Sequence, residues 1–176
     1  IERGKLPGRE LVANILLGPL VLPLVVTALA LLLFFSQLGL VARPAGLFIA
    51  HTVLTIPYVM RTTLASLKSF DPALEEAAWV HGAHPWKAFW SVVLPQIRPG
   101  LVAGGIFAFL VSLDEFTVTL FLSGPGLVTM PIRVYQYIVL HVDPTVSALT
   151  SAIVVVSAVI LIIAERLFKI HRYLEF

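Results

Sequence analysis

Four long apolar stretches divide the sequence and constrain its fold more than any other feature. They lie at residues 11–35, 47–67, 100–122 and 146–164. A helix needs about 20 mainly apolar residues to cross a bilayer, and a helix pairs its backbone hydrogen-bonding groups without water. Charged residues make up only 12% of the chain, whereas soluble domains carry about 25%. We therefore predict an all-α integral membrane protein in which residues 1–176 form one domain with four membrane spans.

Prolines lie inside the first two predicted spans. Pro19 and Pro23 fall within residues 11–35, and Pro57 falls within the second span. A proline removes a backbone hydrogen bond and crowds the preceding turn, and membrane helices tolerate this where neighbours satisfy the freed groups. We expect residues 11–35 to form a kinked helix.

The polar segment between the second and third apolar stretches has the signals of two short helices. Asp71 can cap the first helix and Pro72 suits its first position, while Gly82 can supply the left-handed residue that ends it. Pro85 suits the start of the second helix, and Pro95 is expected to stop it. The segment is therefore predicted to be a helix–glycine–helix elbow.

The elbow, residues 72–95, carries an apolar stripe on its second helix. Trp86, Phe89, Trp90 and Val93 follow the spacing of one helical face, with lysine on another face. This pattern is typical of a helix that lies at a membrane interface or against a partner.

The elbow also resembles a family signature. The permease subunits of ATP-binding-cassette (ABC) importers carry a cytoplasmic loop with E-A-A, three residues, G, nine residues and I-x-L-P. The positions that match this signature, with valine in place of isoleucine, are Glu76, Ala77, Ala78, Gly82, Val92, Leu94 and Pro95. Residues 114–126 and 130–133 further resemble the spermidine/putrescine branch of these permeases, as do 50–52 and 57–67. The likeness extends over nearly all of the chain.

The resemblance implies the fold of a type I ABC importer transmembrane domain. Members usually have six spans, and this chain has four and begins at Ile1 without a methionine, so we expect an N-terminally truncated sequence. The resemblance implies a separate ATPase subunit, a sister permease and an extracytoplasmic solute-binding protein. It also makes the elbow the coupling helix: Glu76 would be the acidic contact with the ATPase, Gly82 the turn, and Ala77 and Ala78 the small residues that permit close approach.

The positive charges predict the orientation. Of the twelve Lys and Arg residues, only Arg43 and Arg133 fall on the side opposite the elbow. Because cytoplasmic loops are enriched in Lys and Arg, we predict that the leader, the elbow and the C-terminal tail are cytoplasmic, in a bacterial-type inner membrane.

Asp114 and Glu115 interrupt the third predicted span in its outer half. Carboxylates within a membrane are costly and usually face a cavity or a partner. One of them could line a route for an organic cation. The alternative is that both are structural, one bonded to a neighbouring helix and the other near the outer interface.

Several other positions are weaker candidates. His51 is interpreted as a hydrogen-bonding packing residue, with a pathway role as the alternative. Tyr58 and Arg61 border the cytoplasmic half of their span, as part of a gate or as interfacial anchors. His81 and His84 have the i, i+3 spacing that could suggest a helical metal pair, but Gly82 breaks the helix and no carboxylate completes a site. Two further residues, which could touch a docking partner or the bilayer surface, are Tyr135 and Tyr137.

We therefore predict a non-catalytic permease subunit of an ATP-driven polyamine importer that contacts lipid and has no cofactor. The sequence has no phosphate-binding glycine loop that ends in Lys and Ser or Thr, and a net charge of +2 gives no indication of nucleic-acid binding. The alternatives are an ABC permease for another solute (an anion, iron, thiamine or betaine) and a self-sufficient secondary transporter. The buried charges favour a cation, since all are acidic apart from Arg61 near a helix end. The inverted repeats and midplane coupling residues typical of secondary transporters are not evident.

Overall fold

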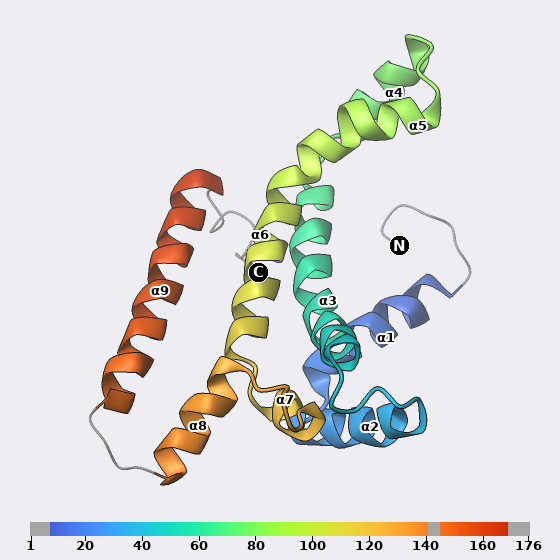
Figure 1. Ribbon diagram of the computed structural model, residues 1–176. Helices are drawn as coiled ribbons and strands as arrows, with labels where there is room; N and C mark the ends of the chain where they lie inside the picture. Colours follow the sequence, from blue (N-terminus) through green and yellow to red (C-terminus); the bar gives the residue numbers. More distant parts are fainter. Residues whose placement is uncertain (1–7, 141–144, 169–176) are drawn as a thin grey trace.

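The computed structural model describes residues 8–140 and 145–168, and every regular element in these two ranges is a helix (Figure 1). The predicted all-α fold is therefore confirmed. In chain order the elements are α1 (Arg9–Val21), α2 (Leu24–Gln37), α3 (Pro44–Lys68), α4 (Pro72–Val80), α5 (Pro85–Ala88), the π-helix η1 (Phe89–Val93), α6 (Leu94–Asp114), α7 (Thr117–Leu122), α8 (Met130–Leu140) and α9 (Thr145–Phe168).

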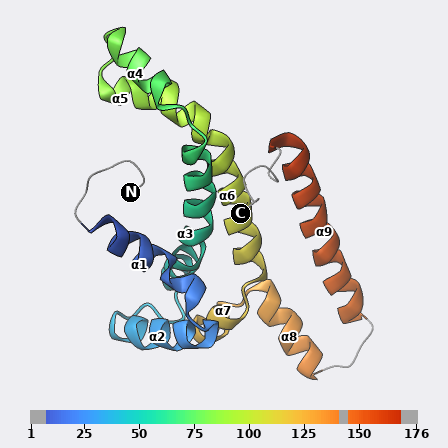
Figure 2. The same cartoon turned by 180° about the vertical axis from the view of Figure 1, so that it is seen from behind.

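Helices α3 and α6 form the centre of the molecule and lie side by side in both views (Figures 1 and 2). Small residues let their backbones approach closely. A Cβ atom added to Gly100 would lie 2.6 Å from the carbonyl oxygen of Thr62, and one added to Gly104 would lie 2.7 Å from the Cα atom of Val59. Small residues at such contacts are the usual basis of helix packing in membranes. The α3–α6 pair is therefore a tightly packed unit.

The first predicted span differs from a simple kinked helix. Helices α1 and α2 are bent by 110° at a short break. Leu22 at the break is extended (φ −77°, ψ 140°), because the residue before a proline is disfavoured in the helical conformation, and Pro23 then caps α2. Pro19 stays inside α1. Whether this bent pair crosses a membrane once stays a prediction.

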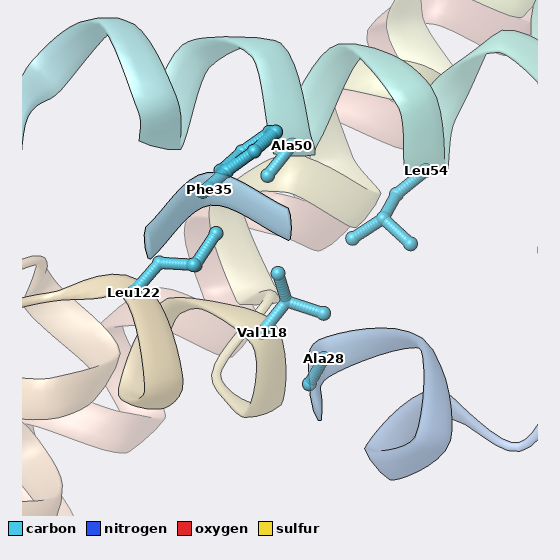
Figure 3. Close-up of a cluster of buried hydrophobic side chains, with 6 residues drawn as sticks. All are labelled: Ala28, Phe35, Ala50, Leu54, Val118 and Leu122. Atoms are coloured by element: carbon cyan, nitrogen blue, oxygen red, sulfur yellow. The ribbon is translucent and has the colours of Figure 1, made fainter. Parts of the chain in front are cut away.

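Helix α2 lies across one end of the α3–α6 pair, where it contacts α7 (Figure 1). A buried apolar cluster joins α2, α3 and α7 at this end (Figure 3). Its members are Ala28, Phe35, Ala50, Leu54, Val118 and Leu122. The cluster fixes the end of the pair that lies away from the elbow.

Two helices within the described ranges, Pro44–Lys68 and Pro85–Asp114, are long and apolar enough to cross a membrane by themselves. The third predicted span thus begins earlier than residue 100 and its helix ends at Asp114, since α7 is a separate helix. The fourth predicted span lies in α9, where Ser147–Ile163 is apolar but shorter. Four crossings therefore remain a prediction.

Candidate functional site

The first half of the elbow forms as its sequence predicts. The backbone N–H of Ala73 donates to the Asp71 carboxylate at 2.9 Å, and Pro72 occupies the first turn of α4. Gly82 is left-handed (φ 81°). The N–H of Ala83 donates to the carbonyl of Ala78 at 3.0 Å, and the N–H of Gly82 donates to that of Trp79 at 2.9 Å. These two bonds are the glycine-terminated helix end known as the Schellman motif.

The second half departs from the prediction at Pro95. Helix α5 begins at Pro85, with the N–H of Trp86 donating to the ring nitrogen Nδ1 of His84 at 3.3 Å. However, Pro95 does not stop the helix, because Pro85–Asp114 runs as one long helix through η1. A proline crowds the carbonyl four residues earlier, and we attribute its tolerance to the π turn, whose bonds reach one residue further. The elbow is therefore continuous with α6.

The elbow stands clear of the helix bundle beyond the ends of α3 and α6 (Figures 1 and 2). Glu76, Ala77 and Gly82 are exposed. Glu76 makes no hydrogen bond or ion pair with any residue in the described part of the chain. Of the other matched positions, Pro95 is exposed, and Ala78, Val92 and Leu94 are half-buried.

Aromatic side chains cover one face of the elbow. Trp86 and Trp90 are 67% and 52% exposed, and their ring centroids lie 5.7 Å apart. Phe89 contacts both rings. Val93, which the sequence predicted on the same stripe, is instead buried, as is Ala88. An exposed apolar face of this kind marks an interaction surface.

The opposite end of the α3–α6 pair holds a buried polar group that we call the α7 corner, formed by His51, Ser112, Glu115 and Thr119. The Glu115 carboxylate accepts the N–H groups of Val118 at 2.7 Å and Thr119 at 2.9 Å, and the Thr119 hydroxyl at 2.8 Å. Glu115 therefore caps the first turn of α7, where free N–H groups favour an anion.

His51 joins α3 to the other two helices of this corner. Its Nδ1 lies 2.7 Å from the Ser112 hydroxyl of α6, and its Nε2 lies 2.8 Å from the Thr119 hydroxyl of α7. The same Nε2 lies 3.9 Å from the Glu115 carboxylate. His51 is thus a hydrogen-bonded packing residue, and its pathway role stays a prediction.

Asp114 differs from its neighbour Glu115. It is exposed and makes no hydrogen bond or ion pair within the described ranges. It borders a cavity of about 310 Å³ between α6, α8 and α9, together with Phe116 and Tyr135, whose ring centroids are 5.0 Å apart. Asp114 also borders a larger cavity of about 740 Å³ against α9. Glu115 is therefore bonded within the fold, whereas Asp114 is exposed beside two cavities.

Other predicted residues lie apart from Asp114. Tyr58 is half-buried in α3 and lines neither of the two cavities that Asp114 borders. Sequence reasoning missed Thr119 and Ser112. The four-residue spacing of Glu115 and Thr119 could have indicated a helix cap, whereas the contact of Ser112 with His51 depends on tertiary packing.

The geometry defines a helical membrane subunit in which a tightly packed helix pair carries an exposed elbow. The chain belongs to the family of the binding-protein-dependent transport system inner membrane component, whose model matches residues 6–172. This family has the type I ABC importer transmembrane fold, so the predicted fold class and family are confirmed.

The similar proteins include permeases for polyamines and for a phosphonate. The putrescine transport system permease protein PotI of Escherichia coli (strain K12) is 35% identical over 159 residues, which cover 87% of this chain and 57% of PotI. The spermidine/putrescine transport system permease protein PotC of the same organism is 30% identical over 165 residues, covering 94% of this chain and 62% of PotC. The putative 2-aminoethylphosphonate transport system permease protein PhnU of Salmonella typhimurium (strain LT2) is 29% identical and is covered to 62%. The chain thus spans about three fifths of the length of these relatives.

Proposed function

We propose that this chain is part of a permease subunit of an ATP-driven importer for polyamines such as putrescine and spermidine. The observation that carries this proposal is the exposed elbow, which matches the family signature and continues directly into α6. The chemistry is transport, with ATP hydrolysis on a separate ATPase subunit. The names of PotI and PotC support the choice of substrate.

Coupling would run through the elbow. Glu76 would contact the ATPase, Ala77 and Ala78 would permit close approach, and Gly82 would provide the tight turn between the two short helices. When the ATPase closes, the elbow would move α3 and α6 together, because their backbones are in close contact at Gly100 and Gly104. This movement would alternate the pathway between the two membrane faces.

The assembly would also contain a sister permease and an extracytoplasmic binding protein, in a bacterial inner membrane. The elbow and the C-terminus would be cytoplasmic. Lys68 ends α3 and Arg166 lies in the last turn of α9, and both helix ends lie toward the elbow (Figure 1). This placement fits the enrichment of Lys and Arg on the cytoplasmic side.

Asp114 is the residue that we assign to the substrate pathway. Its carboxylate makes no bond to residues 8–140 or 145–168 and borders two cavities, whereas the carboxylate of Glu115 accepts three hydrogen bonds within the protein. The rings of Phe116 and Tyr135 border the smaller cavity, and aromatic faces attract cations. A carboxylate beside two aromatic rings suits a primary ammonium group.

Transport of 2-aminoethylphosphonate is the second candidate, because PhnU is also a relative. This solute carries an ammonium group and a phosphonate. A phosphonate is recognised by Arg or Lys, and the smaller cavity beside Asp114 has neither among its lining residues. The diamine is therefore the better fit.

The test is reconstitution of the full-length subunit with its ATPase, sister permease and binding protein in proteoliposomes. ATP hydrolysis would be measured with putrescine, spermidine, 2-aminoethylphosphonate and sulfate. We expect stimulation by the two polyamines, and a KM for putrescine that Asp114→Asn raises about tenfold, which corresponds to about 1.4 kcal/mol. Stimulation by the phosphonate or sulfate alone would contradict the polyamine proposal.

A further inference from the structure

The four side chains of the α7 corner form one continuous chain of hydrogen bonds across three helices. It runs from Ser112 in α6 through His51 in α3 to Thr119 in α7 and then to Glu115. The side chains of His51 and Glu115 are only 13% and 5% exposed, and Thr119 is fully buried. Such a buried network holds its members in one geometry when every group is satisfied.

The direction of each bond follows from the chemistry of the groups. The Thr119 hydroxyl donates its one proton to the Glu115 carboxylate. The Thr119 oxygen then accepts the N–H at Nε2 of His51. Nδ1 of the neutral ring is left as an acceptor, and the Ser112 hydroxyl donates to it. This assignment satisfies the hydroxyl of Thr119 and both ring nitrogens of His51.

Helix α7 depends on this chain for its position. Thr117–Leu122 has six residues, too few for a helix that is stable alone in water. Its apolar side chains Val118 and Leu122 pack into the buried cluster with α2 and α3 (Figure 3). Its polar side is attached to α3 through the bond between Thr119 and His51. That bond therefore ties α7 to the helix that leads directly into the elbow.

We propose that His51 and Thr119 are positioning residues that fasten α7 to the α3–α6 pair, so that α7 moves as one rigid body with this pair, which carries Asp114 at the end of α6. The proposal rests on the proposed transport function only where it interprets that movement as a step of transport. In this proposal the α7 corner, and not the elbow, transmits displacement of α3 and α6 to the wall of the cavities beside Asp114.

The test compares Thr119→Val with Thr119→Ser. Valine has nearly the same shape as threonine and keeps the backbone cap by Glu115, but it removes the hydroxyl and leaves the N–H of His51 without its partner. Serine keeps the hydroxyl and is the rescue control. Spin labels would be placed on cysteines introduced at Phe48 of α3 and Leu120 of α7, which are 75% and 42% exposed. These 176 residues contain no cysteine, and any in the rest of the full-length subunit or in its partner proteins would be replaced.

The distance between the two labels would be measured by pulsed electron resonance in the reconstituted full-length complex, both nucleotide-free and trapped with ATP and vanadate. We expect one narrow distance, the same in both states, for the unsubstituted protein and for Thr119→Ser. Thr119→Val should broaden the distribution and raise the KM for putrescine several-fold, with the serine variant near the unsubstituted value.

Two results would overturn the proposal. One is a distance that changes between the two states in the unsubstituted protein, because α7 would then move relative to α3. The other is a valine variant that matches the serine variant in both distance and KM. If putrescine does not stimulate the unsubstituted complex, the polyamine assignment fails, and the label distances in the two states still decide whether α7 is fastened to α3.

Discussion

The two ends of the α3–α6 pair differ in whether their acidic and apolar side chains are exposed or buried. At the elbow end, a carboxylate and an aromatic face are left exposed, as Glu76 and Trp86 illustrate. At the α7 corner, the carboxylate of Glu115 is buried and accepts three hydrogen bonds from its own chain. One end is thus open to a partner, whereas the other is closed within the protein.

This difference shows how to interpret acidic residues in an apolar chain. A buried charge is tolerated when donors surround it, so Glu115 is explained by the fold alone. Asp114 and Glu76 make no such bonds within the described residues, so the fold does not explain them. The unsatisfied carboxylates are therefore the better candidates for contacts outside this chain.

The comparison of the two ends assumes that the α3–α6 pair between them is rigid. Gly104→Ala should disrupt the close packing of this pair. The added Cβ would lie 2.7 Å from the Cα atom of Val59, a backbone atom that cannot move aside. We expect a loss of about 3 kcal/mol of stability, at the upper end for overpacked sites, measured by thermal unfolding in detergent. Gly105→Ala is the control, because a Cβ there meets nothing within 4 Å. Equal stability of the two variants would contradict close packing of the pair.

Glu115→Gln should weaken the hydrogen bonding at the α7 corner. The amide has one oxygen for two backbone N–H groups, and its NH₂ would face the other donor, so α7 loses part of its cap. We expect a loss of about 2 kcal/mol, the penalty for a buried donor without a partner, in the same unfolding measurement. Asp114→Asn should leave stability unchanged, because that carboxylate makes no bond within the described residues. A reversed order of the two variants would show that the roles of the carboxylates are exchanged.

The open end is tested by Glu76→Lys. Charge reversal on an exposed residue should leave the unfolding temperature unchanged but weaken the contact with an ATPase. We expect uptake by the reconstituted complex to fall about tenfold or more, equivalent to about 1.4 kcal/mol. Gln96→Lys places the same new charge on an exposed position outside the signature and should transport normally. Unchanged uptake by the Glu76 variant would remove the elbow as the ATPase contact.

Local sequence signals predicted the elbow better than the α7 corner. Asp71 and Gly82 act through bonds to residues close in sequence, so their roles can be predicted from spacing. The prediction that Pro95 stops the helix was wrong, because the helix continues through a π turn that the sequence does not indicate. Asp114 and Glu115 are adjacent acidic residues, and the sequence analysis did not distinguish their roles. The bonds of Glu115 to Val118 and Thr119 are local and could have been predicted as a helix cap. The contacts of His51 join residues more than sixty positions apart, beyond any local pattern.

The smallest predicted effect concerns the loop between α2 and α3, which is bonded to the end of α7. Ala42 is left-handed (φ 57°), a conformation that costs a residue with a Cβ about 1–2 kcal/mol. It is held there because its N–H donates to the carbonyl of Leu122 at 2.9 Å. Ala42→Gly should relieve this strain, but glycine also gains freedom in the unfolded chain, worth about 0.5–1 kcal/mol. We therefore expect a net gain of about 0.5 kcal/mol, seen as a slightly higher unfolding temperature.

Gly39 is also left-handed (φ 66°) with open space around it, so Gly39→Ala should have the opposite effect on stability. If Ala42→Gly instead destabilises the protein, the methyl group contributes packing at this corner that outweighs the backbone strain, and the closed end is stabilised by more than its polar network and apolar cluster.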